Sequence, residues 1–200
     1  AGLVNLQALD LSNNNIVELS PEQFAEQTQI TRLDLSSNVI AELHPRQFAG
    51  LAVLRILKLS NNNLYEVHSQ QFADQSLLLI LRLSNNGIAE IHPEGLHGLA
   101  RVTQLQLSNN NIVELHSNQF VGLRDLRFIY LANNNLVELP FDLFGGIIYL
   151  TVLDISNNDI PWLYPQPFGH LIIDELDLSG NHIKSVKQGF LHSSLTLLDI

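Results

Sequence analysis

Histidines recur at a fixed interval along this chain. They are spaced 24 residues apart, at His44, His68, His92 and His116. Stacked imidazoles repel one another once protonated, which predicts a pH-sensing column that acts near about pH 6. No metal site is predicted from them, because a straight row of ligands does not surround an ion tetrahedrally. The alternative interpretation is that duplication copied one repeat position without a function.

Glutamates form a second column with the same interval. Its members are Glu18, Glu42, Glu66, Glu90, Glu114 and Glu138. Like charges at this spacing repel, so the column does not stabilise the fold. The column could bind cations or a basic partner, or neutralise the histidines beside it. The alternative interpretation is a solvated edge that keeps the protein soluble. In the seventh repeat Trp162 and Tyr164 replace the two columns, which indicates either a contact surface or rings folded back on nearby prolines.

Short strands must position these side chains, because an apolar–polar–apolar triplet precedes each column position. The triplets are Leu9-Asp10-Leu11, Leu33-Asp34-Leu35, Leu57-Lys58-Leu59, Leu81-Arg82-Leu83, Leu105-Gln106-Leu107, Ile129-Tyr130-Leu131 and Leu153-Asp154-Ile155. Alternation of period two directs the apolar residues to one face and the middle residue to the other. Stacked as parallel neighbours ~4.8 Å apart, the strands would bury a leucine core and leave an open face.

The open face carries side chains that core packing does not select. We predict a ligand-binding surface there, made of Arg32, Asp34, Ile56, Lys58, Ile80, Arg82, Gln106, Phe128, Tyr130 and Asp154. Arginine and aromatic residues are enriched at binding hot spots, and concave solenoid surfaces are common docking places. The alternative is a solvated, variable face without a ligand.

Two further series are predicted to be structural. Asparagines follow the strands at Asn14, Asn38, Asn62, Asn86, Asn110, Asn134, Asn158 and Asn181. A carboxamide both donates and accepts, so each should satisfy buried backbone groups of the turns above and below it. Bulky residues at Phe24, Phe48, Phe72, Leu96, Phe120, Phe144 and Phe168 should stack as a spine under the convex side.

The composition excludes several classes of function. The 200 residues carry a net charge of −10, which disfavours nucleic acid and anionic membrane surfaces as partners. There is no cysteine, so neither disulfides nor a thiolate metal site is expected. No catalytic motif occurs, and we predict a non-enzymatic protein without cofactor or metal. No apolar run approaches the ~20 residues of a membrane span, so no direct insertion is expected.

The repeated motif resembles a known family. The form L-S-N-N-x-I-x-E-L-x-P-x-x-F-x-G-L is best kept between Leu35 and Leu51, and it is similar to the 24-residue "typical" class of leucine-rich repeats. That class includes Toll-like receptors and insect adhesion and immune proteins. The resemblance implies an α/β leucine-rich-repeat solenoid. It would be a curved right-handed superhelix with a parallel sheet on the concave face and mostly irregular or 3₁₀ convex segments.

The chain departs from the motif in several places. Gln27 and Gln75 stand where leucine is usual, and the seventh and eighth repeats are shortened. We predict one domain over residues 1–200, with about eight repeats, a truncated ninth strand at 195–200 and no capping modules. Uncapped ends would expose strand edges. The chain is therefore expected to be an internal fragment of a longer array, or else to associate head to tail.

The resemblance implies a recognition module that binds a protein or peptide ligand on its concave face. An extracellular or cell-surface location follows from the receptor ectodomains of innate immunity and cell adhesion in that class. The absence of N-x-S/T sequons, of cysteine and of a signal peptide argues against this location. The alternative function is a structural or self-assembling scaffold that forms filaments, or an engineered repeat protein.

Overall fold

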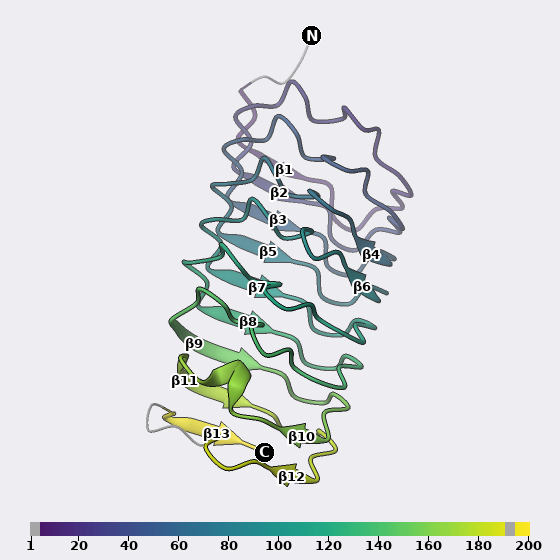
Figure 1. Cartoon of the computed structure of the whole chain (residues 1–200). Helices are drawn as coiled ribbons and strands as arrows, with labels where there is room; N and C mark the ends of the chain where they lie inside the picture. The colour runs from purple at the N-terminus through teal and green to yellow at the C-terminus, as the bar shows by residue number, and fades with distance from the viewer. Residues whose placement is uncertain (1–4, 191–194) are drawn as a thin grey trace.

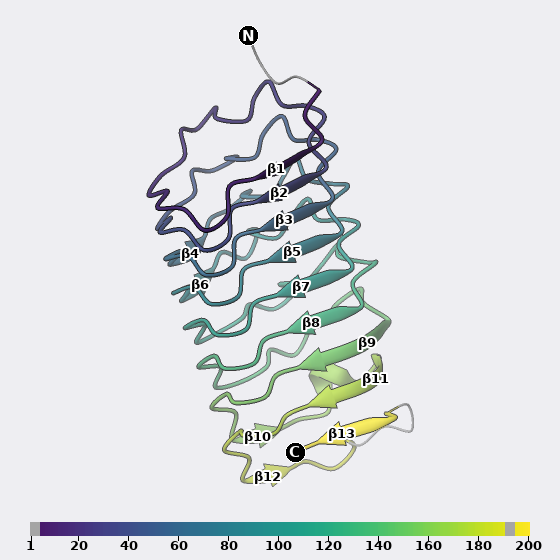
Figure 2. The same cartoon turned by 180° about the vertical axis from the view of Figure 1, so that it is seen from behind.

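The structure is a computed structural model that describes residues 5–190 and 195–200. The chain winds as a solenoid whose turns stack along one axis, with the first described turn and the C-terminus at opposite ends of the stack (Figure 1). Each turn contributes one strand to a nine-stranded parallel sheet, which lies nearer the viewer in Figure 2. The predicted solenoid, with its parallel sheet on the concave face, is confirmed.

The sheet strands are short and follow one another in register. They are β1 (Ala8–Asp10), β2 (Arg32–Asp34), β3 (Ile56–Lys58), β5 (Ile80–Arg82), β7 (Gln104–Gln106), β8 (Phe128–Tyr130), β9 (Tyr149–Asp154), β11 (Ile172–Asp177) and β13 (Leu197–Asp199). Leu153 pairs with Leu176, and Leu176 pairs with Leu198. These offsets of 23 and 22 residues (176 − 153 and 198 − 176) confirm the predicted shortening of the last repeats.

Apolar residues of the strands and of the convex segments form one continuous core. Leu57 and Leu59 are fully buried, whereas Lys58 between them is half-buried on the open face. The predicted aromatic spine is present, with ring centroids 6.2 Å apart for Phe48 and Phe72. Close packing of this kind makes each repeat dependent on its neighbours.

The predicted asparagine ladder exists, but it runs in one direction. Asn110 Nδ2 donates to the carbonyl oxygens of Leu107 (2.9 Å) and Leu83 (3.1 Å), and its Oδ1 accepts from the N–H of Ile88 (3.1 Å). Each carboxamide thus makes hydrogen bonds within its own turn and to the preceding repeat. In the described part of the chain it makes none to the following repeat, whereas the sequence predicted bonds in both directions. Asn14 bonds only within its own turn among the described residues.

The residue before each ladder asparagine adopts a left-handed backbone conformation. Asn61 has φ of 57° and Asn109 also 57°. Asparagine tolerates this region better than other residues with a side chain, which explains the repeated Asn-Asn pairs. Ser37 takes the same conformation, with φ of 56°, without that tolerance.

The convex and flanking segments are mostly turns, as predicted, with some short elements that the sequence did not indicate. Two-residue strands pair along the flank: β4 (Glu66–Val67) with β6 (Glu90–Ile91), and β10 (Trp162–Leu163) with β12 (Ser185–Val186). One 3₁₀ helix, η1 (Gln166–Phe168), begins after Pro165. Its proline-rich sequence favours this tight turn over an α-helix.

Candidate functional site

The strands bring all ten predicted ligand-binding residues onto one face, in two parallel rows. The first row contains Arg32, Ile56, Ile80 and Phe128, with Gln104 between the last two. The second row contains Asp34, Lys58, Arg82, Gln106, Tyr130 and Asp154. The rows are adjacent because their members alternate with one core residue in each strand.

The chain itself neutralises part of the positive charge of the open face. Lys58 Nζ donates to Asp34 Oδ2 at 2.7 Å, and the Asp34 side chain is only 17% exposed. Burial tends to raise the pKa of Asp34, but hydrogen bonds from Lys58 and Ser36 outweigh it and hold this pKa below its ordinary value. These two residues therefore form an ion pair, and a ligand that contacts either of them would compete with that pair.

The aspartates of the second row also have a structural task that the sequence reading missed. Asp34 Oδ1 accepts from the N–H (3.1 Å) and the Oγ–H of Ser36, and Asp154 makes the same pair with Ser156. The repeated Asp-x-Ser spacing was the available signal, since a carboxylate can bond the backbone two residues on. Asp34 and Asp154 thus anchor the turns after their strands.

Arg32 and Arg82 keep their charge available. Neither lies within 4.0 Å of a carboxylate in the described part of the chain. The Nε–H of Arg82 is buried and has no hydrogen-bond acceptor among the described residues. Cavities of ≈ 370 Å³ and ≈ 340 Å³ lie over the face around Arg32, and Arg82 lines neither of them. Arg55, which the sequence reading left out, lines the second cavity with Ile56 and Ile80.

The C-terminal half of the face is aromatic and acidic. Burial, followed by the charges of Glu175 and Asp154, raises the pKa of Tyr130, so its phenol stays protonated and can donate a hydrogen bond. Arg127 lies at the edge with its guanidinium 5.8 Å from the ring centroid of Tyr149. Along the stack the face therefore changes from cationic with half-buried isoleucines to aromatic with acids.

The histidine column lies on the flank, and its members differ in environment. His44 is exposed, whereas the other three are half-buried. Two carboxylates flank His68: Glu66 at 3.5 Å from Nδ1 and Glu42 at 3.8 Å from Nε2. His92 Nδ1 instead accepts from a backbone N–H two residues on. The pH-sensing role of the column stays a prediction.

The backbone of the same column belongs to a second ladder, which sequence reasoning missed. Gln119 Oε1 accepts from the N–H of His116, and its Nε2 donates to the carbonyl oxygen of His92, both at 3.2 Å. Gln75, a departure from the leucine motif, lies at a different repeat position outside this ladder; it is buried and donates to Phe48 O at 2.8 Å. Buried glutamines spaced by repeats were the signal, since buried amides must find partners.

Residues 5–190 and 195–200 contain neither a group of metal ligands nor a membrane-spanning helix. No group of three or more His, Asp or Glu side chains there could hold a metal ion. No helix in this part is long and apolar enough to cross a membrane.

Comparison with known proteins supports the sequence resemblance. A family model described as leucine rich repeat matches residues 4–64, 54–112, 76–136 and 126–183. No curated protein matches the chain. A chain of the octameric complex of Latrophilin 3, Unc5D and FLRT2 is 27% identical with a TM-score of 0.84, over 97% of this chain and 60% of that one.

Two other solved structures share the fold at lower identity. The Toll–Spätzle complex from Drosophila gives 21% identity and a TM-score of 0.89, over 99% of this chain and 27% of that one. The TLR13–ssRNA13 complex gives 22% identity and a TM-score of 0.81, over 99% and 33%. The chain thus spans less than two thirds of the length of each of these three structures.

Proposed function

Because this chain belongs to the leucine-rich-repeat family, we propose that it is a non-enzymatic recognition module whose concave face binds a protein or peptide. Neighbours of the same fold are named as complexes with other molecules, protein in the case of Toll and RNA in the case of TLR13. The net charge of −10 favours a protein ligand here over RNA. An extracellular or cell-surface location is part of the same proposal.

The observation that carries the proposal is the pair of free arginines on the concave face. Arg32 and Arg82 have no carboxylate partner in the described chain, although Lys58 between them is paired. Desolvating an arginine without a partner is unfavourable, so a fold alone does not explain the buried Nε–H of Arg82. A ligand carboxylate would accept hydrogen bonds from the terminal N–H groups of these guanidiniums, which are not among the buried atoms without a partner in the described chain.

The chemistry of the neighbouring residues narrows the ligand class. Ile56 and Ile80 are half-buried on the open face beside the arginines. Apolar side chains next to unpaired cations suit a segment that carries both an acidic and an aliphatic residue. Phe128 and Tyr130 extend the surface toward the C-terminal half, where the ligand would meet aromatic rings. We therefore expect an acidic, apolar peptide segment.

A selection experiment tests this. A random peptide library is displayed on phage and selected on the immobilised chain. Binding of single-stranded poly(U) RNA to the same chain is measured separately, as a test of the alternative ligand class. We expect peptides with acidic and apolar residues, whose affinity falls as salt rises. In the variant Arg32→Glu/Arg82→Glu their affinity should drop by about tenfold or more.

A matched variant separates the site from total charge. Arg101→Glu/Arg124→Glu makes the same change in net charge at exposed positions outside the sheet. The selected peptides should bind it as they bind the parent. Equal binding of the selected peptides to both double variants would show that Arg32 and Arg82 are not part of the site. Binding of RNA, with no peptide selected, would refute the proposed ligand class.

A further inference from the structure

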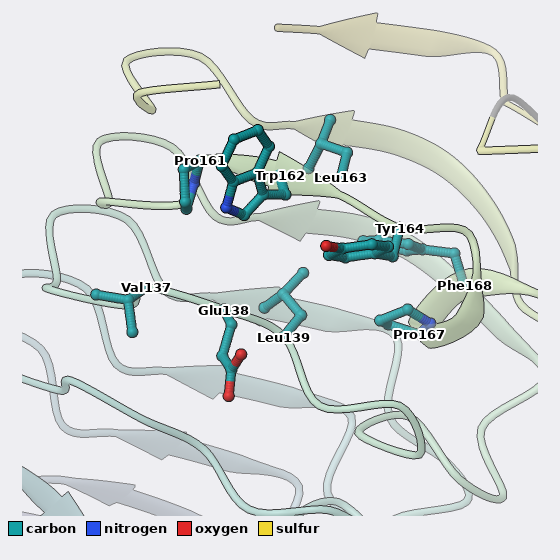
Figure 3. A pocket seen from close by; sticks show the side chains of 9 residues that line it. All are labelled: Val137, Glu138, Leu139, Pro161, Trp162, Leu163, Tyr164, Pro167 and Phe168. Carbon is teal, nitrogen blue, oxygen red and sulfur yellow. The ribbon is translucent and has the colours of Figure 1, made fainter. Parts of the chain in front are cut away.

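A cavity on the flank of the solenoid lies away from the concave face. It has a volume of ≈ 230 Å³. Two consecutive repeats line it, with Val137, Glu138, Leu139, Pro161, Trp162, Leu163, Tyr164, Pro167 and Phe168 (Figure 3). None of these belongs to a strand of the nine-stranded sheet. A ligand in this cavity would leave the concave face open.

Two aromatic rings that are not buried in the core line the cavity. Trp162 is 44% and Tyr164 48% exposed, whereas Leu163 between them is buried. Figure 3 shows the indole and the phenol ring beside the cavity, with Leu139 below them in the view. Large aromatic side chains kept partly in water at the rim of a cavity are typical of contact sites. The sequence allowed either a contact surface or rings folded back on nearby prolines. In the structure both rings keep nearly half of their surface exposed.

An acidic side chain lines the cavity. Glu138 is the one charged residue that lines it, and no Lys or Arg nitrogen of the described chain lies within 4.0 Å of its carboxylate. In Figure 3 this carboxylate points away from the rings, toward the preceding repeats. Because Glu138 is exposed, its side chain can rotate toward a bound group.

The indole of Trp162 already interacts with cations of the chain. Lys187 Nζ lies 5.6 Å and Lys184 Nζ 6.0 Å from the ring centroid. Both lysines flank β12 in the following repeat, and neither lines the cavity. Their contacts with the indole therefore lie outside the lining of the cavity, where Glu138 is the charged residue.

We propose that this cavity binds an arginine or lysine side chain presented by an extended segment of a partner protein. The methylene groups of such a side chain would pack on Leu139 and between the rings. Its cationic head would lie over a ring face and reach the Glu138 carboxylate. The glutamate column continues along this flank with Glu114, and the net charge of −10 attracts basic segments. This site is independent of the concave-face ligand.

The fluorescence of Trp162 can report binding in this cavity. Trp162 is the single tryptophan, so the intrinsic tryptophan fluorescence comes from this cavity alone. The probe is acetyl-Gly-Arg-Gly-amide, and its neutral counterpart has citrulline in place of arginine. We expect a saturable change in fluorescence with the arginine peptide, at concentrations about tenfold lower than the citrulline peptide requires.

Two matched variants complete the experiment. Glu138→Gln should weaken binding of the arginine peptide by about fivefold or more, because the charge-assisted contact is lost. Glu90→Gln removes one charge from the same column two repeats away and should leave the binding curve unchanged. Three results would overturn the proposal: no saturable change, equal binding of arginine and citrulline peptides, or equal weakening by both variants. The last would mean that the acidic flank attracts cations diffusely.

Discussion

Replacing Asn110 by alanine removes a carboxamide that is only 5% exposed, and the structure indicates which groups lose their partners. The carbonyl oxygen of Leu83 keeps a bond from Asn86 Nδ2 (3.0 Å), and that of Leu107 keeps one from Asn134 Nδ2 (3.1 Å). The N–H of Ile88 has no other acceptor among the described residues. One buried donor is therefore orphaned, which costs about 1–3 kcal/mol of unfolding free energy.

Urea unfolding followed by circular dichroism measures this change. Asn111→Ala is the matched control, since Asn111 is exposed and its side chain makes no hydrogen bond within the described residues. We expect a loss of at most about 0.5 kcal/mol for that control, and a similarly small loss for Asn14→Ala, which has no partner in another repeat. Equal midpoint shifts for Asn110→Ala and either control would refute the ladder argument.

Three further predictions concern stability. Ser37→Asn should stabilise the protein by about 0.5–1 kcal/mol in thermal unfolding, because asparagine accepts the left-handed φ of 56° at lower cost. The pKa of Asp34 is lowered by folding, so its stabilisation is fully present above the ordinary value of 3.8 and is lost as pH falls through the lower folded pKa. The stability difference between the parent and Asp34→Asn should therefore shrink below about pH 4. Gln119→Leu should cost about 1 kcal/mol in urea unfolding, because it orphans the half-buried N–H of His116.

In the glutamine ladder, the residue type at one repeat position corresponds to the hydrogen-bonding need of the residue three before it. At the equivalent position in the next repeat Leu143 replaces glutamine, and the residue three before it is Pro140 instead of histidine. Proline has no N–H to satisfy, so a glutamine is not needed there. This agreement can be seen in the sequence only after the structure has identified the bond.

Much of the fold could be predicted from the sequence because each repeat contacts only its neighbours. The spacing of 24 residues places Leu57 over Leu33 and under Leu81, whatever the ligand or the detailed rotamers. The same regularity identified the asparagine ladder, the aromatic spine and the face that carries the candidate site. These features depend on backbone period and side-chain size, which the sequence states directly.

The tertiary structure decided which of the surface charges are free. Lys58 and Arg82 occupy equivalent positions in successive repeats, yet only Lys58 forms an ion pair, because Asp34 lies beside it in the preceding strand. The spacing places Asp34 beside Lys58, but the side-chain conformations decide whether the two groups come within hydrogen-bond distance. The cavity beside Trp162 also depends on the tertiary structure. The proline-rich turn before η1 leaves two aromatic rings at the rim of this cavity instead of packing them inward.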